Sequence, residues 1–151
     1  MFIIPVFVEE YTIPANTAHN SAILRPFALT KGVITKLFIH FPHGCHSLAR
    51  CQFLEGAYQI FPTSTGSFFA DDGYTLPVDE FYILDKFPTS LSWKLWNLDD
   101  TYSHTLRATI VVLPLEVVIP LYGLSEVMNV IKAQQDALYG ILTGEPIVEE
   151  V

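Results

Sequence analysis

The chain has 151 residues, of which 50% are hydrophobic and 13% aromatic, and 16 acidic residues against 8 basic ones give it a net charge of −8. A chain of this length is typical of a single domain with one core. The negative charge disfavours direct nucleic-acid binding, which depends on basic side chains that displace counterions from phosphates. No apolar run approaches the ~20 residues that a membrane-spanning helix needs, so we expect neither a nucleic acid nor a membrane as partner.

The N-terminal segment is apolar but does not resemble a signal peptide. Met1–Val8 contains Pro5, lacks a basic region and is soon followed by Glu9 and Glu10, whereas a signal peptide begins with positive charge. We therefore expect no signal peptide and a cytoplasmic location, in a host cell or otherwise. Residues 1–20 are predicted to form a strand, or an arm that lies on a neighbouring subunit.

Short β-strands dominate the centre of the sequence. Segments of β-branched and aromatic residues recur there between Pro, Gly, Asn and Asp residues, which is typical of strands joined by turns. The fold is therefore predicted to be mainly β, with an antiparallel β-sandwich or jelly roll of about seven to eight strands over residues 21–116. The expected strands, the first of which lies in the N-terminal segment, are 2–13, 22–29, 33–41, 48–54, 58–61, 81–84, 91–96 and 105–113.

Local patterns predict the position of several strands. One face of the third strand is expected to point to the core and carries Val33, Leu37, Ile39 and Phe41. The strands that hold Pro5 and Pro26 are expected to be edges or to be broken there, because proline removes a backbone donor. The stretch Thr63–Pro77 is predicted to be an exposed loop, and the last two strands to form a hairpin or a crossover between sheets.

After Pro120 the spacing of the apolar residues changes to three and four, which predicts an amphipathic α-helix over residues 121–143. Ser125 is a candidate N-cap and Gly144 a candidate residue for ending the helix. Residues 144–151 are expected to form an acidic tail.

Histidine and cysteine side chains gather near the end of the third strand, where His40, His43, Cys45 and His46 follow one another closely. Imidazole and thiolate are the usual ligands of zinc. Their spacing matches no standard zinc signature, and the proline and glycine between them indicate a turn. We expect a solvated turn that holds no metal or other cofactor, and a metal-dependent enzyme that uses His40, His43 and His46 is kept as an alternative.

The other candidate catalytic or ligand-binding side chains are a cysteine and two pairs of aspartates, which turns can account for. Cys45 lies beside histidines that can lower the pKa of a thiol, but no further catalytic group is identifiable. Asp71, Asp72, Asp99 and Asp100 form two pairs of neighbouring carboxylates, and both pairs lie where turn chemistry accounts for them. We therefore expect that the chain is not an enzyme.

The two tryptophans are expected to face opposite sides of one strand, because residues three apart on a strand alternate. Trp93 is predicted to lie in the core. Trp96 is predicted to be exposed or at an interface, where tryptophan often contributes strongly to binding. An exposed Trp96 with a nearby tyrosine is the basis of a second hypothesis, a lectin-like carbohydrate-binding module.

Several short segments resemble short uncharacterised open reading frames from tailed phages and viral metagenomes. The segments are Thr30–Thr35, Phe41-Pro42, Gly44-Cys45, Gln59–Pro62, Trp96-Asn97 and Val112–Pro114. The resemblance implies a small β-sandwich virion protein such as a capsid decoration (cement) protein, with a trimer favoured. It also implies that the partner is a major capsid or other virion protein and that the chain is found in the virion or the host cytoplasm.

Surplus apolar residues at both ends of the chain independently indicate a homo-oligomer, because low charge and many aromatic residues are common on protein contact surfaces. We expect the subunit contacts to be made by the N-terminal segment, one tryptophan and the helix. The residues expected at these contacts are Phe2, Ile4, Phe7, Trp96, Leu124, Met128, Ile131 and Leu138.

Overall fold

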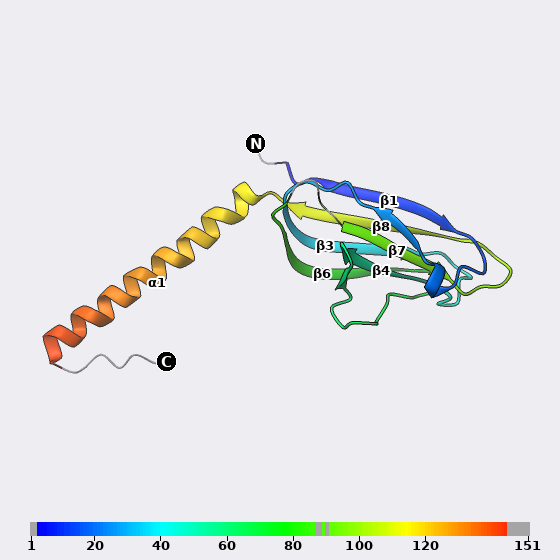
Figure 1. Cartoon of the computed structure of the whole chain (residues 1–151). Helices are drawn as coiled ribbons and strands as arrows, with labels where there is room; N and C mark the ends of the chain where they lie inside the picture. Colours follow the sequence, from blue (N-terminus) through cyan, green and yellow to red (C-terminus); the bar gives the residue numbers. More distant parts are fainter. Residues whose placement is uncertain (1–2, 87–88, 90, 145–151) are drawn as a thin grey trace. The chain divides into compact units, whose positions relative to one another are not determined.

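The structure is a computed structural model that describes residues 3–86, 89 and 91–144. Within these residues, eight strands and one long α-helix confirm the predicted mainly β fold (Figure 1). The elements are β1 (Val6–Ile13), the 3-10 helix η1 (His19–Ser21), β2 (Ile23–Pro26), β3 (Gly32–Phe41), β4 (Ala49–Glu55), β5 (Tyr58–Phe61), β6 (Tyr74–Leu84), β7 (Leu91–Asn97), β8 (His104–Leu113) and α1 (Leu115–Thr143).

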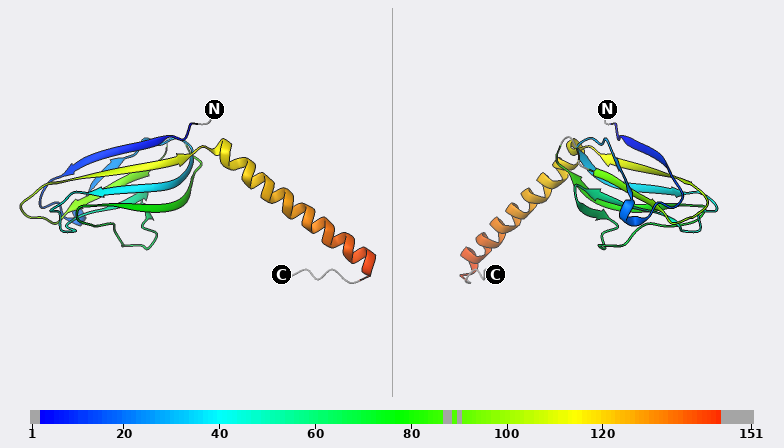
Figure 2. Two further views of the ribbon diagram at one scale, coloured as in Figure 1. Left: turned by 180° about the vertical axis from the view of Figure 1, so that it is seen from behind. Right: turned by 45° about the vertical axis from the view of Figure 1, so that its right-hand side comes forward.

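The strands form two antiparallel sheets that face each other as layers (Figure 2). Sheet A has the order β1-β8-β3-β6 and sheet B the order β2-β7-β4-β5. Because β7 belongs to sheet B and β8 to sheet A, the connection between them is a crossover and not a hairpin. Apart from the β4–β5 hairpin, neighbouring strands in each sheet are not consecutive in the sequence.

Apolar side chains from the inner faces of both sheets make one core. Trp93 of β7 is fully buried, as predicted, and its ring stacks on Phe53 of β4 with centroids 6.0 Å apart and planes 7° apart. Phe27, Phe61 and Phe69 pack around Phe53. Large aromatic side chains thus fill the space between the sheets, which explains the high aromatic content of the sequence.

A β-bulge changes the face pattern predicted for β3. Leu37 and Ile39 point into the core as expected, but the register with both neighbouring strands shifts between Ile34 and Lys36. The extra residue of a bulge reverses the alternation on one side of it. As a result Ile34, in place of Val33, joins the core cluster.

Proline positions agree with the edges of the sheets. Pro26 lies in edge strand β2, and Pro5 immediately precedes edge strand β1, as predicted. Pro77 lies inside β6, which begins at Tyr74, so the loop expected up to this proline is shorter than predicted. An edge strand tolerates proline because the missing N–H faces away from the sheet.

The segment Val6–Ile13 is a strand of the chain's own sandwich, since all its residues pair with β8. The structure thus contains the strand that is one of the two predicted alternatives for this segment, and an arm on a neighbouring subunit stays a prediction.

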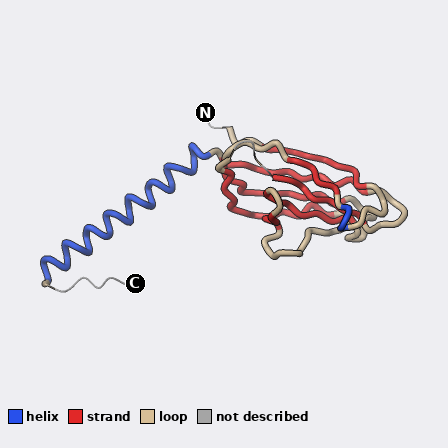
Figure 3. The backbone as a smooth tube through the Cα atoms, in the orientation of Figure 1, coloured by secondary structure: helices blue, strands red, loops and turns tan. Residues whose placement is uncertain are grey.

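The α-helix begins earlier than predicted and is continuous in Figure 3. α1 starts at Leu115, so Pro120 lies in its second turn and Ser125 lies inside it, where it is not the N-cap. Gly144 follows the helix with φ of 67° and donates its N–H to Gly140 O, in agreement with the predicted end. The boundary between two compact units of the chain falls after Pro114.

No helix among the described residues is long and apolar enough to cross a membrane.

Candidate functional site

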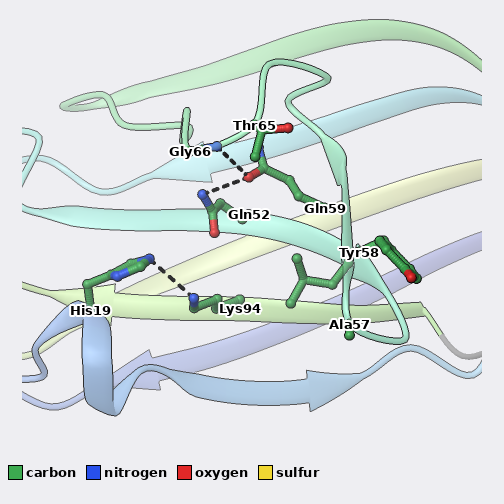
Figure 4. Close-up of a pocket in the computed structure, with 9 residues that line it drawn as sticks. His19, Gln52, Ala57, Tyr58, Gln59, Thr65, Gly66 and Lys94 are labelled. Atoms are coloured by element: carbon green, nitrogen blue, oxygen red, sulfur yellow. Dashed lines mark hydrogen bonds between the residues drawn. The ribbon is translucent and has the colours of Figure 1, made fainter.

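A groove of about 420 Å³ lies on the outer face of sheet B (Figure 4). One wall is the loop between β5 and β6, which folds over β4. Phe69 exchanges two backbone hydrogen bonds with Cys51, and Ser67 O accepts a hydrogen bond of 2.7 Å from Gln52 Nε2. The loop is thus held against the sheet by both backbone and side-chain groups.

Two glutamines from neighbouring strands hold this wall. Gln59 of β5 donates through Nε2 to the carbonyl oxygens of Pro62, Ser64 and Ser67. Its Oε1 accepts hydrogen bonds from Gln52 Nε2 at 3.1 Å and from the backbone N–H of a loop glycine at 3.0 Å. The side chain of Gln59 is therefore fully used within the protein and shapes the loop.

The other wall combines a strand and the 3-10 helix. Lys94 of β7 lies opposite Gln52 of β4 in the strand register, so both side chains emerge on the outer face of the sheet. The Lys94 Nζ atom lies 3.2 Å from His19 Nε2 in η1. Tyr58, at the start of β5, lines the groove and is 80% exposed.

Two further hollows adjoin this groove. One of about 210 Å³ shares His19 and Gly66 with it and is also lined by Arg50 and Phe68. The other, of about 370 Å³, shares Ala57 and Tyr58 with it. The main groove and the hollow beyond His19 together make an elongated track over the outer face of sheet B. The hollow beyond Tyr58 is lined by residues of both β5 and β6 and lies at the edge of the sandwich.

The prediction that Trp96 is exposed or at an interface is wrong, because the side chain is only 2% exposed. Its ring lies on the outer face of sheet B but is covered by Phe68 and His19, whose ring centroids are 5.7 and 4.7 Å away in edge-on geometry. The Arg50 guanidinium in turn lies 4.4 Å from the Phe68 ring centroid. Trp96 therefore supports the loop and offers no flat surface to a ligand.

The other residues expected at subunit contacts have different environments. Ile4 is exposed, and Phe7 of β1 packs against the core of its own sandwich. Met128, Ile131 and Leu138 of α1 are exposed. Phe2 and the side chain of Leu124 lie outside the described residues.

The structure does not bring the predicted histidine cluster together. His40 hydrogen bonds to Thr75 on the outer face of sheet A. His46 lies in the turn after β3, where its Nδ1 is 3.6 Å from Oδ2 of Asp72 in the β5–β6 loop. Among the described residues, no three His, Cys, Asp or Glu side chains are placed so that they can share a metal ion. His43, which lies against Gly73, has a separate position again.

Both cysteines are free and buried. Burial raises the pKa of the Cys51 thiol to about 12 and also raises the pKa of the Cys45 thiol. Cys45 Sγ donates a hydrogen bond to Asp71 O at 2.9 Å. A raised pKa keeps the thiol protonated, which is the opposite of what an activated nucleophile requires.

Comparison with known proteins adds no relative: no family model matches the chain, and no curated protein or solved structure is found to be similar to it.

The groove residues were not predicted from the sequence. The sequence offered one signal: the polar residues Gln52 and Lys94 occupy outward positions of their strands. The other outward positions of the same strands include the apolar residues Leu54 and Trp96. That signal shows that the positions are polar but not that they lie opposite each other.

Proposed function

We propose that the chain is a structural protein that assembles into a homo-oligomer and acts through protein–protein contacts, without enzymatic activity. The observation that carries this proposal is the apolar surface of α1. Exposed apolar side chains along the helix include Val127, Ile131, Leu138 and Ile141, which are 55%, 43%, 58% and 77% exposed. Full burial of one such side chain contributes about 1.5–3 kcal/mol, so an association that covers them is favourable.

The spacing of these residues favours other helices of the same kind as partners. Val127, Ile131, Gln134, Leu138 and Ile141 follow one another at alternating intervals of four and three residues. This is the a and d pattern of a coiled coil, in which each helix packs its stripe against the same stripe of another helix. A second copy of the chain carries the same stripe on its own α1, so we take a second copy as the partner.

Gln134 lies in the middle of the stripe at a d position. A polar residue inside a coiled coil commonly selects one register and one number of chains, because any other alignment leaves its amide unpaired. Such a residue supports a defined oligomer over unspecific association. We propose a trimer.

The assembly is tested by light scattering after size exclusion of the full chain at micromolar concentration. We expect a mass three times the chain mass of 17.0 kDa. Ile131→Gln with Leu138→Gln should yield the mass of one chain, since the apolar stripe is interrupted. The matched control, Asn129→Gln with Asp136→Gln, changes the opposite face of α1 and should leave the mass unchanged. A monomeric wild-type chain would contradict the proposal.

The finer proposal is that this oligomer is a capsid decoration (cement) protein that binds a major capsid or other virion protein. A small sandwich with an exposed helix suits such a role, because it needs contacts and no catalytic centre. Mass spectrometry of purified particles of the virus that encodes the chain should detect it in amounts comparable to the capsid protein. Absence from the particles would remove the virion role and leave the assembly proposal standing.

A further inference from the structure

We propose that the groove on sheet B is a binding site for a linear oligosaccharide, a property independent of the assembly through α1. The starting point is Gln52, which is only 4% exposed. Its Nε2 donates both hydrogens inside the protein, to Gln59 Oε1 and to Ser67 O. Its Oε1 accepts no hydrogen bond from any group in the part of the chain that the structure describes.

The free oxygen of Gln52 points into the groove. Figure 4 shows it turned away from Gln59 and toward the side where His19 and Lys94 lie. This oxygen is not enclosed in the core, so a donor in the groove, either water or a ligand, can reach it. A ligand with a hydroxyl or N–H donor at this point would satisfy it.

A donor stands beside this acceptor. Lys94, opposite Gln52 on the neighbouring strand, has three N–H donors, and among the described residues its one hydrogen-bonding partner is His19. Thr65 adds a hydroxyl from the loop wall. An acceptor next to a donor matches the neighbouring hydroxyl groups of a sugar, because each hydroxyl can both donate and accept.

An aromatic ring lies at one end of the groove. Tyr58 projects from the β4–β5 turn, and its exposed ring has an apolar face and a polar tip. The C–H groups of a sugar ring can pack on such a face while the hydroxyls at its rim remain hydrogen bonded. The ring therefore takes the role that Trp96, covered by Phe68, cannot take.

The length of the track favours a chain of sugars over a single one. The main groove is within the ~300–1,000 Å³ range of ligand sites, and it continues over the outer face of sheet B into the hollow with which it shares His19 and Gly66. A peptide is less well matched, since extended peptides usually add to a free strand edge, whereas this track crosses the outer face of a sheet. We therefore assign the track to a polysaccharide segment.

The test is binding of the full chain to an array of short linear oligosaccharides, both neutral and uronate-containing, with affinities of positive members then measured by calorimetry. Tyr58→Ala and Lys94→Met should each weaken binding about tenfold, whereas Tyr58→Phe should bind almost as well as the wild type, because it retains the ring. Tyr102→Ala and Lys36→Met, which change exposed residues of the same types outside the track, are the matched controls and should bind normally.

Three results would overturn the assignment: no binding to any member of the array, binding that Tyr58→Ala and Lys94→Met leave unchanged, or saturable binding of extended peptides that competes with the sugars at lower concentration. Circular dichroism of each variant verifies that the fold is retained. Light scattering of Tyr58→Ala should still yield the wild-type mass, so that failure of the sugar site is distinguishable from failure of assembly.

Discussion

The carboxylate of Asp99 organises the turn between β7 and β8. Its Oδ1 accepts hydrogen bonds from the backbone N–H groups of Thr101 and Tyr102 at 2.9 and 3.0 Å, and its Oδ2 accepts one from His104 Nε2 at 2.7 Å. These donors, the Tyr102 and Thr101 N–H groups first and His104 after them, lower the pKa of Asp99 from 3.8 to about 2. Asp99 is thus a structural residue that joins the turn to the first residue of β8.

The lowered pKa predicts how stability depends on pH. The carboxylate binds its proton more weakly in the folded chain than in the unfolded chain, so its stabilising effect is complete above about pH 4 and is lost as the pH falls toward 2. In urea unfolding, Asp99→Asn should be less stable than the wild type at neutral pH, and the difference should shrink as the pH approaches 2. Asp100→Asn, at the exposed neighbouring position, is the control and should follow the wild type. A difference that stays constant over this range would contradict the assignment.

The start of β3 and the end of β8 approach each other closely. Gly32, the first residue of β3, lies beside the pair Val33–Leu113. A Cβ atom on Gly32 would lie 2.4 Å from Leu113 O and 2.6 Å from Val112 Cγ1. The first contact is with backbone, which cannot move without shifting the strand. Glycine is therefore required here by space.

Gly32 also has a positive φ, of 156°. Gly32→Ala should therefore lower the free energy of unfolding by about 1–3 kcal/mol through the steric clash, in addition to the cost of backbone strain. Gly56→Ala is a demanding control, because Gly56 also has a positive φ but has no atom within 4 Å of the added Cβ. It should cost about 1 kcal/mol through backbone strain alone. Equal losses in chemical denaturation would contradict the steric explanation.

Individual strands were largely predictable from the sequence because a strand between a core and solvent alternates in polarity. Leu37 and Ile39 illustrate this rule. Prediction failed where tertiary structure overrides local pattern. The bulge at Ile34 follows from pairing with two neighbours, and Pro77 is acceptable only because β6 is an edge. In both cases the neighbouring strands come from distant parts of the sequence, so the local pattern does not predict them.

The groove was less predictable than the strands for the same reason. Gln52 and Gln59 lie on neighbouring strands, but Lys94 joins them only because β7 pairs with β4 after a long intervening loop and strand. The covering of Trp96 depends on Phe68, which lies in a loop without regular structure. A periodic pattern predicts burial of one strand face but not what covers the other.

At the scale of the whole molecule, the core cluster found among the described residues lies in the sandwich. Every residue of the core cluster lies between Ile13 and Val112, and the compact unit that contains it ends at Pro114. A region with its own hydrophobic core is expected to fold independently.

A chain that ends at Pro114 should therefore fold as a monomer. We expect its near-ultraviolet circular dichroism to match that of the sandwich in the full chain, and its unfolding to remain cooperative. Light scattering should yield the mass of one chain at the concentrations used to test the proposed oligomer of the full chain. A truncated chain that is unfolded would contradict the independence of the sandwich, and a truncated chain that is trimeric would move the assembly contacts away from α1.

The presence of one groove on each chain has a consequence for surface attachment. If three chains are joined through their helices, three sugar sites are tethered, and the second and third binding events become intramolecular, with an effective concentration that can reach the millimolar range. Each site can then be weak while the assembly dissociates slowly from a densely glycosylated surface. The same protein would release readily from an isolated oligosaccharide, so avidity would distinguish a cell envelope from free sugar.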